Sequence, residues 1–191
     1  MSPGSDTATV LVVDDEEEVA DVYALRLRNE FDTRVAYSGD DALASLDDDI
    51  DVVLLDRRMP DQSGDEVLER IREGEYDYRV IMLTAVDPGL DIAEMPFDDY
   101  LCKPVEKEDL VTAIEQQLRI KRHDDALAEY LEVTSKLDLL EAELSSQQLS
   151  DNEEVGALRD RAADLRAEVE GSVDDLDEIE DSFQEIGRYP G

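Results

Sequence analysis

The sequence predicts an α/β fold with a parallel sheet, followed by an all-α helical region. Three observations lead to this prediction. From residue 9 to about residue 104, short apolar runs alternate with amphipathic stretches, as they do in βαβ units. The runs are mostly β-branched or aliphatic, which is typical of parallel strands covered by helices on both faces. Beyond residue 126 the apolar residues recur at heptad spacing, which is typical of long paired helices.

Five apolar runs are expected to form strands, and amphipathic stretches between them are expected to form helices. The crossover at 85–99 differs, because Pro88, Gly89 and Pro96 leave room for little helix. The other stretches each place apolar residues on one helical face. The expected strands are 10–13, 35–37, 52–55, 80–83 and 100–102, and the helical faces are Val19, Tyr23 and Leu27; Ala42, Leu43 and Leu46; Val67, Leu68 and Ile71; and Leu110, Ile114 and Leu118.

The last of these helices has no glycine or proline to end it, since neither residue occurs from 105 to 155. Its apolar stripe nevertheless slips, because helical steps from Leu118 reach Lys121 and Asp125, whereas the next apolar set starts at Leu127. We therefore expect a bend or a domain boundary at 121–125. The expected division is a flexible N-terminus at 1–8, an α/β domain at 9–122, a helical domain at 123–187 and a tail at 188–191.

Two helices are expected in the helical domain, at 126–146 and 153–186, with the polar segment 145–152 between them. Ser150 and Glu153 have the spacing of a capping box that would start the second helix. Heptad positions from Val155 to Ile186 are apolar except for Ser172, and Gly187 is placed to cap the helix. The pattern predicts either an antiparallel hairpin within one chain or a coiled coil between two chains. In a hairpin, the end of the longer second helix would run back beside the last helix of the α/β domain.

The charge of the chain excludes two classes of partner. There are 53 Asp and Glu residues against 18 Lys and Arg residues, which gives a formal net charge of -35. Nucleic acids and anionic membranes are bound mainly through basic side chains, so we expect no membrane contact and no direct DNA binding by the helical domain. So much like charge destabilises a compact fold unless salt screens it. We therefore hypothesise adaptation to a salt-rich cytoplasm; a circular dichroism spectrum unchanged between low salt and molar KCl would contradict this.

A cytoplasmic location is expected for the chain. The N-terminal residues have neither the basic nor the apolar part of a signal peptide, and no apolar run is long enough to span a bilayer. Cys102 is the only cysteine, so no intrachain disulfide can form, and it is expected to be a small core residue. His123 is the only histidine, and we expect an ordinary solvated side chain there.

Chemically useful side chains follow the predicted strands, at the edge of a parallel sheet where ligands bind. Asp14 and Asp15 follow the first strand, Asp56 the third, Thr84 the fourth and Lys103 the fifth. Three clustered carboxylates favour a bound cation, and an oxygen-only ligand set suits Mg²⁺. The ammonium and the hydroxyl suit a transferring phosphoryl group, and a carboxylate can attack phosphorus and become an aspartyl phosphate. Asp56, in the central position, is the expected nucleophile.

Each of these residues alone also has an ordinary explanation. Adjacent aspartates are frequent in this acidic chain, so Asp14 and Asp15 could be a solvated pair. Asp56 could cap a helix, Thr84 could be a buried hydroxyl and Lys103 a surface lysine. The joint occurrence of all of them at strand ends, in this order, favours the functional interpretation.

Four segments carry a resemblance to a known family. Val-Val-Asp-Asp at 12–15, Leu-Leu-Asp-Arg-Arg-Met-Pro-Asp-Gln-Ser-Gly at 54–64, Leu-Thr-Ala at 83–85 and Asp-Tyr-Leu-Cys-Lys-Pro at 99–104 resemble the receiver domain of two-component response regulators. The resemblance covers residues 9 to about 120. It implies a flavodoxin-like, doubly wound five-stranded sheet of order 2-1-3-4-5. It also implies a cytoplasmic signalling protein that accepts a phosphoryl group from a sensor histidine kinase, rather than an enzyme acting on separate substrates.

The same resemblance implies roles for individual residues. Asp56 would be the phosphoacceptor, and Thr84 and Lys103 would contact the phosphoryl group. Mg²⁺ would be bound directly by Asp15 and Asp56, by Asp14 largely through water, and by the backbone carbonyl of Arg58. Thr84 would move toward the phosphoryl group and Tyr100 would turn into the vacated space. The peptide bond before Pro104 would be cis.

The tail resembles the helical HalX-type domain that is attached to receivers in haloarchaea. A homodimer through this tail, docking of a partner and a hairpin packed within the chain remain open alternatives. The broken crossover at 85–99 puts the family's usual dimer or partner face in doubt. Two other functions compete with the leading one: an aspartyl-nucleophile phosphohydrolase, which generally has a second Asp where this chain has Arg58, and a coiled-coil scaffold that works without phosphorylation.

Overall fold

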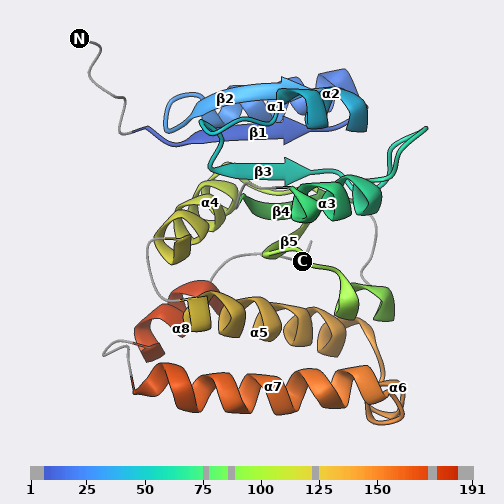
Figure 1. The fold of residues 1–191 in the computed structure, drawn as a ribbon, viewed down its shortest axis with the longest axis vertical. Helices are drawn as coiled ribbons and strands as arrows, with labels where there is room; N and C mark the ends of the chain where they lie inside the picture. The colour runs from blue at the N-terminus through green and yellow to red at the C-terminus, as the bar shows by residue number, and fades with distance from the viewer. Residues whose placement is uncertain (1–6, 75–77, 86–88, 122–124, 172–175, 185–191) are drawn as a thin grey trace.

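The computed structural model describes residues 7–74, 78–85, 89–121, 125–171 and 176–184 of the 191-residue chain (Figure 1). Its centre is a parallel sheet of order β2-β1-β3-β4-β5. This confirms the predicted fold class and sheet order. The strands are β1 (Thr9–Val13), β2 (Asp32–Ala36), β3 (Val52–Leu55), β4 (Arg79–Thr84) and β5 (Asp99–Cys102).

Four of the strands lie close to their predicted positions, and β2 is the exception. It was expected at 35–37 from its apolar residues, but it begins at Asp32 and pairs with β1 through Asp32, Thr33 and Arg34. As an edge strand it is only partly buried, so polar side chains are tolerated there and the apolar pattern understates its length. Cys102 is buried at the end of β5, as expected of a core residue.

Helices cover both faces of the sheet. On one face α1 and α4 pack over a core that contains Val10, Leu54 and Ile81. On the other face α2 and α3 pack over Leu11, Val53 and Met82, which point the opposite way from their strand neighbours. The helices are α1 (Glu17–Leu27), α2 (Gly39–Ser45), α3 (Gly64–Glu73) and α4 (Lys107–Lys121).

The crossover between β4 and β5 contains no α-helix in its described residues. It holds only a short 3₁₀ helix, η1 (Leu90–Glu94), as the prolines and the glycine of this segment predict. The sheet face beside β5 therefore lacks the helix that every other crossover provides.

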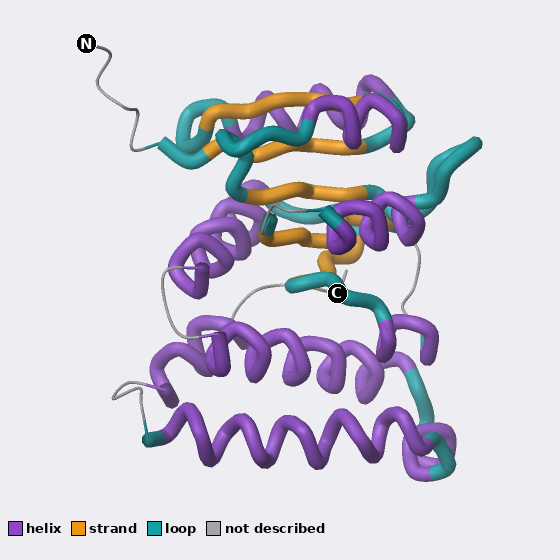
Figure 2. The backbone as a smooth tube through the Cα atoms, viewed as in Figure 1, coloured by secondary structure: helices purple, strands orange, loops and turns teal. Residues whose placement is uncertain are grey.

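The C-terminal helices cover this face instead. Leu139, Leu140, Leu149 and Val155 belong to the same buried core as β5 and η1. Figures 1 and 2 show α5 lying between the sheet and α7, and both helices also contact η1. The described residues of this helical region form the helices α5 (Asp125–Glu143), α6 (Ser146–Ser150), α7 (Glu153–Glu170) and α8 (Leu176–Gln184).

Polar contacts accompany this packing. The Ser135 hydroxyl of α5 donates to Asp99 Oδ1 of β5 at 3.2 Å, and both side chains are buried. Lys136 Nζ lies 5.1 Å from the centre of the Phe97 ring, a cation–π contact, and is paired with Glu132 at 2.8 Å. The helical region is thus joined to the sheet by apolar and polar contacts together.

Within the helical region, α5 and α7 form a hairpin in one chain, one of the two arrangements that the heptads predict (Figure 1). The predicted bend at 121–125 lies where α4 ends at Lys121 and α5 begins at Asp125, with 122–124 outside the described residues. His123 lies in that gap.

The prediction that Ser150 caps the start of the second long helix was wrong. Ser150 lies inside α6, and its hydroxyl donates to the Gln147 carbonyl. The N-cap of α7 is Asn152, whose Oδ1 accepts from the backbone N–H groups of Glu154 and Val155 at 2.9 and 3.1 Å. The residue next to the helix forms the cap because its short side chain reaches both free N–H groups.

The prediction of one uninterrupted helix at 153–186 was also wrong. Helix α7 ends at Glu170, and Gly171 follows as its C-cap, because glycine is a poor helix former. The apolar residues after the break do not extend the hairpin. Leu176 and Ile179 of α8 instead pack in a separate core with Tyr130 and Leu165. Ile120 at the end of α4 belongs to the same core, so the C-terminal residues do reach the last helix of the α/β part. The predicted heptad position Ser172, Ile186 and the cap Gly187 lie outside the described residues.

None of the helices in the described ranges is long and apolar enough to cross a membrane.

Candidate functional site

The residues predicted to form a site meet at the carboxyl edge of the sheet. Asp14 and Asp15 follow β1, Asp56 follows β3, Thr84 ends β4 and Lys103 follows β5. One carboxylate oxygen from each of the three aspartates lies within 4.8 Å of the others. The parallel topology explains this, because the carboxyl ends of β1, β3, β4 and β5 share one edge.

Lys103 is the cation of this cluster. Its Nζ donates to Asp14 Oδ2 and lies 3.7 Å from Asp56 Oδ1, with the side chain only 15% exposed. The peptide between Lys103 and Pro104 is cis, as the resemblance implied. The other oxygen of Asp14 accepts from the Glu16 backbone at 3.0 Å, which holds this carboxylate in place.

The environment of Asp56 disfavours its charge. The pKa of Asp56 is raised to about 6, mainly by burial. The nearby carboxylates of Asp14 and Asp15 also raise it, while Lys103 and a hydrogen bond from Thr84 act in the opposite direction. A bound cation would offset the burial and the repulsion between carboxylates. The burial of Asp56 and the repulsion between the carboxylates are therefore consistent with a cation site.

The donor set suits Mg²⁺ in particular. Asp14 and Asp56 are buried and Asp15 is partly exposed, so the cluster is open on one side. A cavity of about 520 Å³ adjoins it and is lined by Asp56, Arg58, Thr84 and Lys103 among others. Oxygen ligands with room for water and phosphate oxygens are what Mg²⁺ prefers. The residues present therefore fit the ion.

Tyr100 and Thr84 occupy neighbouring strands behind the cluster. Both are fully buried, and the Tyr100 ring packs on Phe97 with 5.5 Å between the ring centres. Burial raises the pKa of the Tyr100 phenol to about 12, against the opposing effect of a hydrogen bond with Arg57. The phenol therefore stays protonated at neutral pH.

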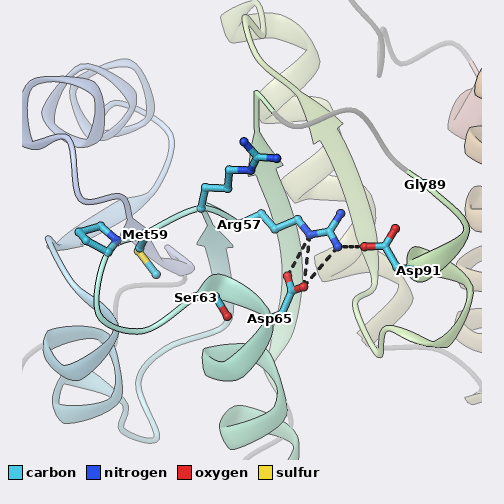
Figure 3. A pocket seen from close by; sticks show the side chains of 8 residues that line it. Arg57, Met59, Ser63, Asp65, Gly89 and Asp91 are labelled. Carbon is cyan, nitrogen blue, oxygen red and sulfur yellow. Dashed lines mark hydrogen bonds and ion pairs between the residues drawn. The ribbon is translucent and has the colours of Figure 1, made fainter.

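Arg57 is the residue of this region that sequence reasoning missed. Its Nε lies 3.0 Å from Asp65 Oδ1 of α3, its Nη2 lies 3.2 Å from Asp65 Oδ2, and Nη2 also pairs with Asp91 of η1 (Figure 3). The one signal in the sequence was a basic residue directly after Asp56. Its partners lie 8 and 34 residues further along, so no local spacing identifies them.

Gly64 brings the start of α3 against the backbone that carries Asp56 and Arg57. Its N–H donates to the Arg57 carbonyl at 2.8 Å, and a Cβ on residue 64 would lie 2.1 Å from the Asp56 carbonyl oxygen. Ser63 and Glu66 close a capping box at the same helix end. The loop after Asp56 is therefore held by α3.

We expect Gly64→Ala to lower the free energy of unfolding by about 3 kcal/mol, because the new methyl group collides with backbone that cannot rotate away. Urea unfolding in molar KCl measures the change. Gly156→Ala in α7 is the matched control, since a Cβ there meets no atom within 4 Å. That variant should be neutral or stabilised by up to about 1 kcal/mol. Equal effects from the two substitutions would contradict the role of Gly64.

Comparison with known proteins gives two family matches. The profile of the response regulator receiver domain matches residues 10–115, and that of the HalX domain matches residues 119–186. A predicted transcriptional regulator of Haloferax volcanii is 45% identical over 168 residues, which are 86% of this chain and 28% of that protein. The chain thus spans less than a third of the length of this relative.

Solved receiver domains resemble the α/β part. The BeF3-activated receiver domain of DrrB is 28% identical with a TM-score of 0.55, covering 59% of this chain and 98% of its own. The response regulator TrrA of Thermotoga maritima, solved with Mg²⁺ and beryllium fluoride, is 28% identical with a TM-score of 0.51, covering 58% and 99%. A receiver domain from Clostridium thermocellum is 30% identical with a TM-score of 0.55, covering 60% and 97%.

Proposed function

We propose, because this chain belongs to the response regulator receiver family and carries a HalX domain, that it is a signalling protein switched by phosphorylation of Asp56. The observation that supports this most is the cluster of Asp14, Asp15 and Asp56 with Lys103 and Thr84 beside one cavity. A phosphohydrolase that releases phosphate from small substrates is not favoured by any described contact.

The proposed reaction begins with an Asp56 carboxylate oxygen attacking the phosphorus of a phosphohistidine. The phosphorus–nitrogen bond breaks, the imidazole leaves and takes up a proton, and Asp56 becomes an acyl phosphate. Lys103 balances the added negative charge from its position beside Asp56, and Thr84 donates a hydrogen bond to a phosphoryl oxygen. The proposed donor is a sensor histidine kinase, because the chain belongs to the receiver family.

Asp14, Asp15 and Asp56 would hold Mg²⁺, with the backbone carbonyl of Arg58 as a further ligand. The bound ion would neutralise charge on the phosphoryl oxygens. Support comes from the oxygen donor set and from the relatives solved with Mg²⁺ or BeF3. Thr84 and Tyr100 would then act as the switch, because both side chains are buried on the neighbouring strands β4 and β5 and Thr84 hydrogen-bonds with Asp56.

The helical region is the proposed output element. The proposed location of the protein is the cytoplasm. The region is acidic, and its described residues form no basic cluster that would attract DNA. Direct DNA binding is therefore not part of this proposal. A homodimer through this region stays a prediction. Light scattering of the full chain in molar KCl, with and without phosphorylation, would test it, and a monomer mass in both states would contradict it.

One experiment tests the phosphoacceptor directly. The full chain is incubated with Mg²⁺ and acetyl phosphate, or with a phosphorylated histidine kinase, in molar KCl, and its intact mass is measured. We expect one added phosphoryl group that is absent without Mg²⁺. A folded protein that gains no phosphoryl group under these conditions would refute the proposed function.

Mg²⁺ affinity is expected to depend on pH, because metal ligands must lose their protons. Since the pKa of Asp56 is raised to about 6, the ion must displace a proton from this carboxyl below that pH. The apparent dissociation constant should be constant above about pH 7 and rise about tenfold per pH unit below about 6. Calorimetric titration at several pH values measures it. An affinity independent of pH between 5 and 7 would contradict this assignment.

A further inference from the structure

We infer that Arg57 is a positioning residue that couples the acceptor site to the helical region, by holding Tyr100 and η1 to the loop that follows Asp56. This inference rests on the proposed function, because it describes how the state of Asp56 would reach α5 and α7. The contacts that carry it lie outside the cluster of Asp14, Asp15 and Lys103.

The first step is the position of the arginine between four elements. Arg57 follows Asp56 directly, and its carbonyl is fixed to the N-terminus of α3 by the Gly64 N–H. Its side chain, 11% exposed, forks onto Asp65 of α3 and reaches Asp91 of η1. The same guanidinium interacts with the Tyr100 hydroxyl of β5, and this interaction raises the pKa of Arg57 and opposes the effect of burial on the pKa of Tyr100. One planar group therefore joins the acceptor loop to α3, η1 and β5.

The second step is the position of η1 between Arg57 and the hairpin. Asp91 faces the arginine, as Figure 3 shows, whereas the next two residues, Ile92 and Ala93, are buried in the core shared with the helical region. Both α5 and α7 pack against η1. A shift of Asp91 thus moves residues that touch the hairpin, since a turn of five residues has little room to absorb it.

The third step is the shape of the cation. Arg57→Lys would keep the charge but would lose the planar fork that reaches Asp65, Asp91 and the Tyr100 phenol at once. Asp91→Asn would remove the charge that attracts the guanidinium to η1 without touching the loop after Asp56. The two substitutions therefore break the same connection from opposite ends.

A thermodynamic cycle tests the inference. Calorimetry measures the dissociation constant of Mg²⁺ and beryllofluoride for the full chain in molar KCl. The hairpin is perturbed by Val155→Ala, which trims the shared core, or by Glu154→Gln, an exposed change where α7 meets Glu94 of η1. We expect either change to alter the dissociation constant at least about fivefold, which is the lower end of typical coupling between sites. In the Arg57→Lys and Asp91→Asn backgrounds the same changes should have no effect.

The controls separate this inference from the proposed function. Arg34→Lys is the matched arginine control, because Arg34 pairs with Asp47 and Asp49 far from η1, and it should leave the fivefold effect intact. Equal effects of the hairpin changes in all backgrounds, or no effect in the unmodified chain, would overturn the role of Arg57 while leaving phosphorylation of Asp56 standing. Absence of beryllofluoride binding by the folded, unmodified chain would instead overturn the proposed function and the coupling with it.

Discussion

Replacing Asp56 with asparagine is expected to abolish phosphoryl uptake and, in metal-free buffer at pH 7, to make the protein more stable. The first effect follows because the amide cannot attack phosphorus. The second follows because Asp56 is buried beside Asp14 and Asp15, and its pKa is raised from 3.8 to about 6. Burying the charged Asp56 carboxylate lowers the free energy of unfolding, whereas burying the neutral asparagine amide does not carry this cost.

The sign and size of the stability change follow from proton linkage. A shift of about 2 pKa units corresponds to as much as about 3 kcal/mol at pH 7. The folded state binds the proton more tightly than the unfolded chain, so the cost is full above about pH 6 and disappears below 3.8. The stability gain of Asp56→Asn should therefore shrink as the pH falls from 7 to 4. Urea unfolding across this range measures it.

Mg²⁺ supplies the control for this prediction. The ion binds the unmodified chain better than the variant, so saturating Mg²⁺ should reduce or reverse the stability gain. A variant that is less stable than the unmodified chain in metal-free buffer at pH 7 would contradict the account of the Asp56 environment. Phosphoryl uptake by the variant would show that another residue is the acceptor.

Ending the chain after Lys121 is expected to abolish cooperative folding of the α/β part. The four buried residues contributed by the helical region, Leu139, Leu140, Leu149 and Val155, would all be lost from the core beside β5 and η1. Loss of a single buried leucine side chain costs about 2 to 5 kcal/mol, and typical domains have only about 5 to 15 kcal/mol to lose. The free energy lost by removing all four side chains at once should exceed the free energy of unfolding of the remaining α/β part.

Near-ultraviolet circular dichroism and urea unfolding in molar KCl test this expectation. Leu140→Ala, at a fully buried position, should cost about 3 kcal/mol, whereas Leu25→Ala, at a position 54% exposed on α1, should change stability by no more than about 0.5 kcal/mol. A shortened chain of residues 1–121 that unfolds cooperatively with unchanged stability would show that the shared core is not needed.

The sequence predicted the parts of this protein that depend on local pattern and on one topological rule. Strands such as β1 and β3 are short buried runs with clear ends, so their positions followed from apolar residues. The carboxylate cluster followed because the carboxyl ends of parallel strands share an edge, which brings Asp14 and Asp56 together without any knowledge of side-chain geometry.

The parts that were not predicted depend on contacts between distant segments or on competition between similar signals. The break after Glu170 was hidden because the heptad pattern continues across Gly171. Asn152 and Ser150 were both plausible caps, and only the position of α6 decides between them. The partners of Arg57 lie on α3 and η1, and the packing of α5 on the sheet depends on a surface that no local pattern reveals.

The core shared between the sheet and the C-terminal helices has a consequence for the order of events during synthesis. A ribosome makes the five strands first, yet the face beside β5 closes only after α5 and the start of α7 have been made. Until then, the core that contains Phe97 and Ile92 lacks the residues of the C-terminal helices, and unfinished apolar surface of this kind favours misassembly. The α/β part of the nascent chain is therefore expected to finish folding late, together with the C-terminal helices as one cooperative unit.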